Sequence, residues 1–143
     1  MKKYLAVILA ALAIAVATPS AHAAGWRPPL KDKCRFQFMD GHKDWSTKEV
    51  RYTIKCAVNR WPVPGGLTQA MYVANRESGY HQFAYNPSGC SGVYQWAQGT
   101  WSSVLNDFPP LYKVLGHSVW NARSNVMYAV KYAHNRGWGP WGF

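Results

Sequence analysis

The chain is organised around the stretch Ala74-Asn75-Arg76-Glu77-Ser78-Gly79-Tyr80, which joins an apolar helix to a long glycine-rich loop. Apolar residues recur at helical spacing between Leu67 and Ala74, which predicts Glu77 on the last turn of a short helix. Gly79 is suited to end that helix, because helix termini often need the left-handed conformation that glycine adopts readily.

A carboxylate at Glu77 would face the negative end of the helix dipole, which disfavours a negative charge. Shielding by apolar side chains would favour the protonated form further, and a general acid needs that proton. The alternative is a solvated carboxylate paired with Arg76 or a lysine. The residues after Tyr80 favour the first interpretation, because they are glycines, aromatics and amides with almost no other charge, as in a cleft for a polar, uncharged ligand.

Three motifs carry a resemblance to a known family: Glu77-Ser78, then Gly92-Val93-Tyr94-Gln95, then Ala133-His134-Asn135-Arg136-Gly137. They resemble the lytic transglycosylase motifs Glu-Ser, Gly-Leu-Met-Gln and Ala-Tyr-Asn-Ala-Gly, at compatible spacing. The arrangement is also similar to the catalytic domain of resuscitation-promoting factors. The resemblance covers residues 67–141 and implies a mainly α (α+β), lysozyme-like fold, with a small irregular β element beside the catalytic helix.

The resemblance implies an exported enzyme that cleaves the β-1,4 bond between N-acetylmuramic acid and N-acetylglucosamine in peptidoglycan. Glycoside hydrolysis usually needs two carboxylates about 5 to 10 Å apart. Besides Glu77, the chain after the leader offers no acid suited to be the second one; its other acids are Asp32, Asp40, Asp44, Glu49 and Asp107. We therefore expect Glu77 to act alone as general acid and base, with help from the substrate's acetamido group.

The resemblance also implies substrate-binding residues around Glu77. His134 stands where the family has a tyrosine that hydrogen-bonds the catalytic glutamate, so His134 or the nearby Tyr132 is expected in that role. Asn86 stands where many relatives have a serine near the acetamido group. The expected substrate-binding residues are Ser78, Asn86, Tyr94, Gln95, Trp96, Tyr132, His134 and Asn135.

The chain has eight tryptophans and nine tyrosines, more than a core of this size needs. Sugar rings present flat C–H faces that stack on aromatic planes, while Tyr and Trp also offer a polar tip. Tyr94 and Trp96 are the expected wall of a sugar-binding groove. Trp138 and Trp141 are expected either to stack on sugar or to pack the C-terminus onto the core.

Three segments are predicted along the chain. Residues 1–23 have the pattern of a signal peptide, with two lysines, an apolar run too short for a membrane span of about 20 residues, and Ala21-His22-Ala23 as a cleavage site. Residues 24–45 read as an irregular arm with one short strand at 35–39. Residues 46–143 are the predicted catalytic domain. We expect a secreted or cell-envelope protein, monomeric and not inserted in a membrane.

Helices are predicted within the catalytic domain from their caps and apolar faces. Ser46-Thr47-Lys48-Glu49 is a capping box that starts the first. A second ends at Gly79, and a β element is expected around 91–95. Further helices are expected at 98–107, capped by Thr100, at 111–115, and from a cap at Asn121 to Gly137.

Charge and cysteines suggest partners and compartment. Sixteen Lys and Arg face six Asp and Glu, for a formal net charge of +10, which favours anionic cell-wall polymers. The basic residues are scattered, so sequence-reading nucleic-acid binding is not expected. Cys34, Cys56 and Cys90 allow one disulfide in three combinations, and we favour Cys34–Cys56.

Neither a cofactor nor a metal is indicated, because the sequence has no phosphate-binding loop and no metal-ligand spacing. Three alternatives to a lytic transglycosylase remain open. They are a lysozyme-type hydrolase, a non-catalytic peptidoglycan-binding module, and a basic protein that acts on membranes or nucleic acid.

Overall fold

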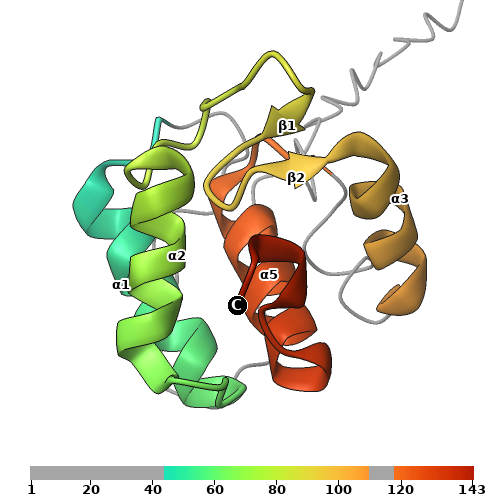
Figure 1. The fold of residues 1–143 in the computed structure, drawn as a ribbon. Helices are drawn as coiled ribbons and strands as arrows, with labels where there is room; N and C mark the ends of the chain where they lie inside the picture. Colours follow the sequence, from blue (N-terminus) through green and yellow to red (C-terminus); the bar gives the residue numbers. More distant parts are fainter. Residues whose placement is uncertain (1–43, 110–117) are drawn as a thin grey trace, which may run out of the picture.

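The structure, a computed structural model, describes residues 44–109 and 118–143. Most of these residues are helical, and two short strands pair antiparallel (Figure 1), so the predicted mainly α fold with a small β element is confirmed. In chain order the elements are α1 (Thr47–Arg60), α2 (Gly66–Ser78), β1 (Cys90–Ser91), β2 (Trp96–Ala97), α3 (Gln98–Asp107), α5 (Ala122–Arg136) and the 3₁₀ helix η1 (Gly139–Trp141).

Helix α1 begins at the predicted capping box. The Glu49 amide donates to the Ser46 hydroxyl at 3.3 Å, and the Ser46 amide donates to the Glu49 carboxylate at 2.8 Å. Both amides would otherwise lack a partner at the helix start. The apolar face of the helix is buried, including Val50 and Ile54, as the spacing predicts.

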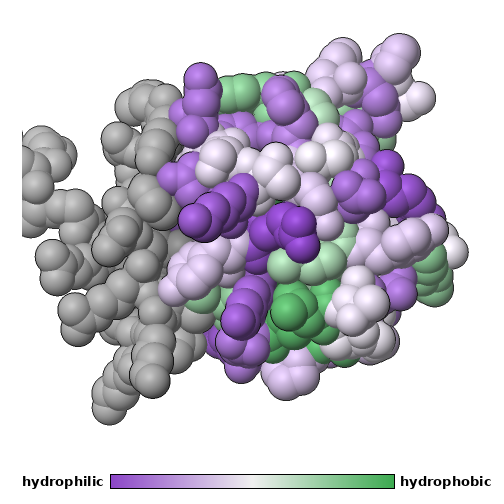
Figure 2. All heavy atoms as spheres, turned by 90° about the vertical axis from the view of Figure 1, so that its left-hand side faces the viewer, coloured by the Kyte–Doolittle hydropathy of each residue, from purple (hydrophilic) through white to green (hydrophobic). Residues whose placement is uncertain are grey.

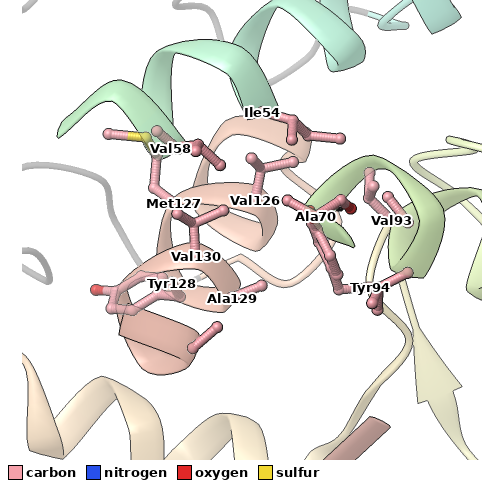
Figure 3. Packing of buried hydrophobic residues seen from close by; sticks show 14 of the residues in the cluster. Ile54, Val58, Ala70, Val93, Tyr94, Val126, Met127, Tyr128, Ala129 and Val130 are labelled. Atoms are coloured by element: carbon pink, nitrogen blue, oxygen red, sulfur yellow. Dashed lines mark hydrogen bonds between the residues drawn. The ribbon is translucent and has the colours of Figure 1, made fainter. Parts of the chain in front are cut away.

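Helix α5 lies at the centre of the fold, with α1 and α2 on one side and α3 on the other (Figure 1). Its first nine residues are all buried, because neighbours surround this part of the helix. Figure 3 shows Val126 and Val130 of α5 facing Ile54 and Val58 of α1. The predicted cap at Asn121 is confirmed: its side chain accepts from the Ser124 amide at 3.1 Å.

The β element is a hairpin in which Cys90 pairs with Ala97 and Ser91 with Trp96. The strands therefore flank residues 92–95, which form the turn, and the hairpin lies around the predicted residues 91–95, with its paired strands at either end. Gly92 is required in this turn for two reasons. Its φ of 79° is left-handed, and an added Cβ would lie 2.1 Å from the side-chain Nδ2 atom of Asn125.

Helix α3 has the predicted bounds, and Trp101 and Val104 are buried as expected. Its predicted cap is wrong. The helix begins before Thr100, so Ala97 occupies the N-cap position and supplies no side-chain hydrogen bond.

Several predictions fall outside the described residues: the leader 1–23, the arm up to residue 43 with its strand at 35–39, the helix at 111–115, and Cys34. The pairing of Cys34 with Cys56 therefore stays a prediction. Within residues 44–109 and 118–143, no helix has the length and apolar character needed to cross a membrane.

Helix α1 displays basic side chains on its outer face. Lys48, Arg51 and Lys55 are all exposed and recur every three to four residues, so they form one stripe. Figure 2 looks onto the side of the molecule formed by α1 and α2, where hydrophilic side chains cover most of the surface around a smaller hydrophobic area.

Candidate active site

Glu77 lies on the last turn of α2, and Gly79 ends the helix in the left-handed conformation with φ of 61°, as predicted. The Glu77 side chain is 21% exposed, so it is neither in bulk solvent nor fully buried. It lines a cavity of about 360 Å³ that we call the Glu77 cavity. The lining residues are Arg76, Glu77, Cys90, Gln95, Trp96, Ala97, Thr100, Pro140 and Trp141.

The carboxylate of Glu77 is paired with its neighbour Arg76. Arg76 donates to Oε1 of Glu77 from Nη2 at 2.6 Å and from Nε at 3.1 Å. The same Nη2 donates to the carbonyl of Trp141, and the guanidinium lies 4.3 Å from the centre of the Phe143 ring. The pairing expected in the alternative interpretation is therefore present, but it occurs inside a cavity and ties Glu77 to the C-terminal segment.

Among the described residues, no second carboxylate lines this cavity. Glu49 is used in the α1 cap, and Asp107 forms an ion pair with Arg136 at 3.0 Å. The third, Asp44, is exposed just before α1. Within residues 44–109 and 118–143, then, Glu77 is the acid available for proton transfer in its cavity.

The hairpin brings Gln95 and Trp96 to the same cavity. The Gln95 amide group donates to the carbonyls of Ala84 and Gly92, both at 2.9 Å, which fixes its orientation. Gln95 has φ of 49°, an uncommon conformation for a residue with a side chain. Such strain persists where the surroundings over-determine it, often near functional sites. Ligand binding by these two residues stays a prediction.

Tyr94 does not form a groove wall, so that prediction is wrong. Its exposed fraction is 0%, its hydroxyl donates to the carbonyl of Ala70 at 2.9 Å, and its ring stacks on Trp138 with centroids 5.9 Å apart. Burial raises the pKa of the Tyr94 phenol. Figure 3 shows this ring beside Ala70, within the packed interior.

Ser78 and Asn86 hold the loop between α2 and the hairpin, and neither lines the Glu77 cavity. The Ser78 hydroxyl donates to the carbonyl of Val93 at 2.7 Å. The Asn86 side chain accepts from the Cys90 amide at 3.0 Å. Their hydrogen bonds position the residues that do line the cavity, and substrate contact by either stays a prediction.

The expected partners of Glu77 on α5 are also wrong. Nδ1 of His134 is 2.7 Å from the carbonyl oxygen of Pro62, in the loop between α1 and α2, so this nitrogen is not bonded to Glu77. Tyr132 packs edge-on against Trp96 and Trp141, with centroids 5.9 Å away in each case. Asn135 is exposed and does not line the cavity. Arg76 takes the role expected of these residues.

Of the two open interpretations of the C-terminal tryptophans, core packing is confirmed. Trp138 and Trp141 are both buried, and their indole nitrogens donate to the carbonyls of Pro64 at 3.0 Å and Tyr94 at 2.8 Å. Trp141 also lines the Glu77 cavity, so it belongs to the core and to the site.

Sequence reasoning missed Asn125, the residue that holds the hairpin. Its side chain is fully buried, accepts from the Tyr94 amide at 2.8 Å, and donates to the carbonyls of Val119 at 2.9 Å and Ser91 at 3.3 Å. Its only sequence signal is an amide directly before the apolar run that starts at Val126. Among residues 44–109 and 118–143, no group of His, Cys, Asp or Glu is arranged to hold a metal ion. Cys90, which lines the cavity, has a free thiol.

Comparison with known proteins gives a partial match. Over 72 residues the chain is 44% identical to proteins named "Probable transglycosylase SceD" from Staphylococcus aureus strains Newman, Mu3 and USA300. The match covers 48% of this chain and 29% of each relative, so the chain spans less than a third of their length. No family model and no solved structure matches. The match supports a relationship to transglycosylase-like proteins.

Proposed function

We propose that the protein is an exported peptidoglycan-cleaving enzyme of the lytic transglycosylase type, with Glu77 as its general acid and base. The observation that carries the proposal is a single carboxylate lining a cavity, with aromatic and amide groups beside it and no second acid among the described lining residues. The partial identity to proteins named probable transglycosylases supports the same class of reaction.

The proposed reaction starts with the protonated form of Glu77. Its proton passes to the glycosidic oxygen, and the bond from that oxygen to C1 of N-acetylmuramic acid breaks. The acetamido oxygen of the same sugar stabilises the positive charge that develops at C1. The Glu77 carboxylate then takes the proton of the sugar's 6-hydroxyl while that oxygen bonds to C1. The product is a 1,6-anhydro sugar, and Glu77 regains its proton.

Arg76 constrains this scheme. The ion pair exists only while Glu77 is ionised, so donation of a proton requires the Arg76 contact to open in the substrate complex. Arg76 can re-form the contact after the proton has left, when the carboxylate acts as base. Apo geometry of catalytic hydrogen bonds often differs from that in the substrate complex, so the pair does not exclude the acid role.

The lysozyme-type hydrolase differs only in the acceptor at C1, which would be water. A non-catalytic binding module would keep the cavity but release no fragments. Because no second carboxylate that could activate water lines the described cavity, we favour the anhydro product over hydrolysis.

Export and wall association complete the proposal. The leader at residues 1–23 would direct the protein out of the cell, where peptidoglycan is accessible. The basic stripe of Lys48, Arg51 and Lys55 would then attract anionic wall polymers without reading a sequence or a specific shape.

The test is mass spectrometry of the soluble products from purified peptidoglycan incubated with the protein. The lytic transglycosylase predicts fragments that end in 1,6-anhydro-N-acetylmuramic acid. Reducing ends without the anhydro sugar would assign the hydrolase. Binding to the wall without release of any fragment would contradict an enzymatic function and leave the binding module.

A further inference from the structure

A second cavity lies beside the hairpin, separate from Glu77. Its volume is about 560 Å³, within the range of about 300 to 1,000 Å³ common for small-molecule sites. We call it the aromatic cavity. It is lined by Tyr85, Gly89, Ser91, Trp96, Gln98, Trp101, Ser102, Leu105, Ser118, Val119 and Trp120.

The two cavities share Trp96 but otherwise use different residues of the same hairpin and helix. Cys90 lines the Glu77 cavity, whereas Gly89 and Ser91 on either side of it line the aromatic cavity. Successive residues of an extended strand point to opposite faces. A ligand in the aromatic cavity would therefore lie on the other face of β1 from the reacting bond at Glu77.

Two large aromatic side chains at this cavity are open to solvent. Tyr85 is 65% exposed and Trp120 is 38% exposed, and their ring centroids lie 6.4 Å apart at a tilt of 45°. Exposed rings of this size contribute little to a core, but they offer flat surfaces on which the C–H face of a sugar ring can stack.

The rest of the described lining is uncharged and combines apolar side chains, such as Leu105 and Val119, with polar ones. Gln98, Ser102 and Ser118 supply an amide and two hydroxyl groups, which can exchange hydrogen bonds with sugar hydroxyls. None of the described lining residues carries a charge, so nothing there matches the phosphates of a nucleic acid. Stacking surfaces with neutral polar groups fit a neutral saccharide.

The backbone around the two exposed rings is fixed. The buried side chain of Gln82 donates to the carbonyl of Trp120 at 3.0 Å, and Asn125 donates to that of Val119 at 2.9 Å. Tyr85 pairs with Ser91 in an isolated β-bridge. Because ordering costs are already met in the free protein, such a preorganised surface binds with less entropy loss.

We propose that the aromatic cavity is a second, non-catalytic carbohydrate site that binds neutral or N-acetylated pyranose rings. Its identification with the glycan of peptidoglycan rests on the proposed function, but its ligand class rests on the lining residues. On an insoluble polymer such a site would keep the enzyme close to bonds that it has yet to cut.

The test is a ¹H–¹⁵N NMR titration with tri-N-acetylchitotriose in the Glu77→Gln background, where no cleavage can interfere. We expect amide shifts at Tyr85, Ser102 and Trp120. In Trp120→Ala, the chitotriose affinity measured from these shifts should fall about tenfold. Trp120→Phe, which keeps a ring, should retain most of it, and Tyr52→Ala on α1 should change nothing.

Shifts absent from these amides, or unchanged affinity in Trp120→Ala, would overturn the second site. If Trp120→Ala does not fold, Tyr85→Ser at the other ring takes its place: weaker binding in that variant would support the site, and unchanged affinity would overturn it. The proposed function fails separately: wild-type protein that binds chitotriose at Trp120 but releases no fragments from peptidoglycan would disprove the enzyme and keep the site.

Discussion

The Glu77 cavity and the aromatic cavity differ in charge, although both are built on the same hairpin and on α3. The first contains a carboxylate and the guanidinium paired with it at 2.6 Å. The second has no charged residue among its described lining, but it has two exposed rings. Proton transfer needs an ionisable group in a restricted setting, whereas sugar recognition needs only flat apolar surface and hydrogen bonds.

One rigid element can therefore serve two tasks when its two faces carry different chemistry. Asn125 connects both faces, because its side chain holds the Tyr94 amide on the turn and the Val119 carbonyl beside the aromatic cavity. Damage to this connection should affect both cavities, as should a change to Trp96, which lines both, whereas a change to a residue that lines one cavity should affect that cavity alone.

The largest effect is expected for Glu77→Gln. The amide cannot donate and recover a proton, so peptidoglycan cleavage should fall by at least about 100-fold. Chitotriose binding at the aromatic cavity and the thermal unfolding midpoint should stay unchanged. A dye-release assay on labelled peptidoglycan measures the rate, and wild-type-like cleavage in this variant would remove Glu77 from the mechanism.

Gly92→Ala should damage both cavities together. The new Cβ would lie 2.1 Å from the side-chain Nδ2 atom of Asn125 and 2.7 Å from the carbonyl oxygen of Val119, at a backbone φ of 79°. Strain and overpacking together should lower the free energy of unfolding by about 3 kcal/mol, measured by urea denaturation. Gly142→Ala is the matched control, because φ there is 78° but nothing lies within 4 Å. It should cost about 1 kcal/mol, and equal losses in the two variants would argue against the contact with Asn125.

Alkylation of Cys90 should affect the Glu77 cavity and leave the aromatic cavity intact. Its free thiol lines the Glu77 cavity and is partly exposed, so iodoacetamide would add a bulky amide beside Glu77. Cleavage should slow about tenfold, because small misplacements of substrate cost much of the rate. Binding of chitotriose at Trp120 should persist. Cys90→Ser should be active and insensitive to the reagent; continued inhibition there would place the effect at another residue.

The smallest effect is expected for the basic stripe, which lies on α1 away from both cavities. Replacing Lys48, Arg51 and Lys55 with Gln should weaken binding to whole cell walls about threefold at low salt and reduce its salt dependence. A wall-pelleting assay over increasing NaCl measures both. Arg136→Gln is the control, because that charge is already paired with Asp107. Cleavage of short soluble glycans should not change in either protein.

Local features of the fold were predictable because they depend on residues close in sequence. The Ser46–Glu49 box and the Gly79 terminator each act within one helical turn, and the bounds of α3 follow from an apolar face between a loop and Pro109. The position of Glu77 at a helix end followed in the same way. The strand positions did not, because pairing of Cys90 with Ala97 depends on hydrogen bonds to Asn125, 28 to 35 residues further along.

The roles of individual side chains were less predictable than the elements that carry them. Tyr94 and Gln95 are neighbours in one motif, yet the turn places Tyr94 in the core and Gln95 in the lining of the Glu77 cavity. His134 sits in the expected motif, but its ring reaches the Pro62 carbonyl instead of Glu77. Motif spacing does not specify which way a side chain points, because the packing of other elements decides that.

Short-range propensity and composition were enough to predict the α-helices of the described residues, most of their ends, and one acid in a stretch of neutral, aromatic residues. The tertiary structure alone decided that Arg76 pairs with Glu77 while holding the C-terminal segment, and that Tyr85 and Trp120 meet across 35 residues. Such contacts depend on how α5 and the hairpin pack together, which no local pattern records.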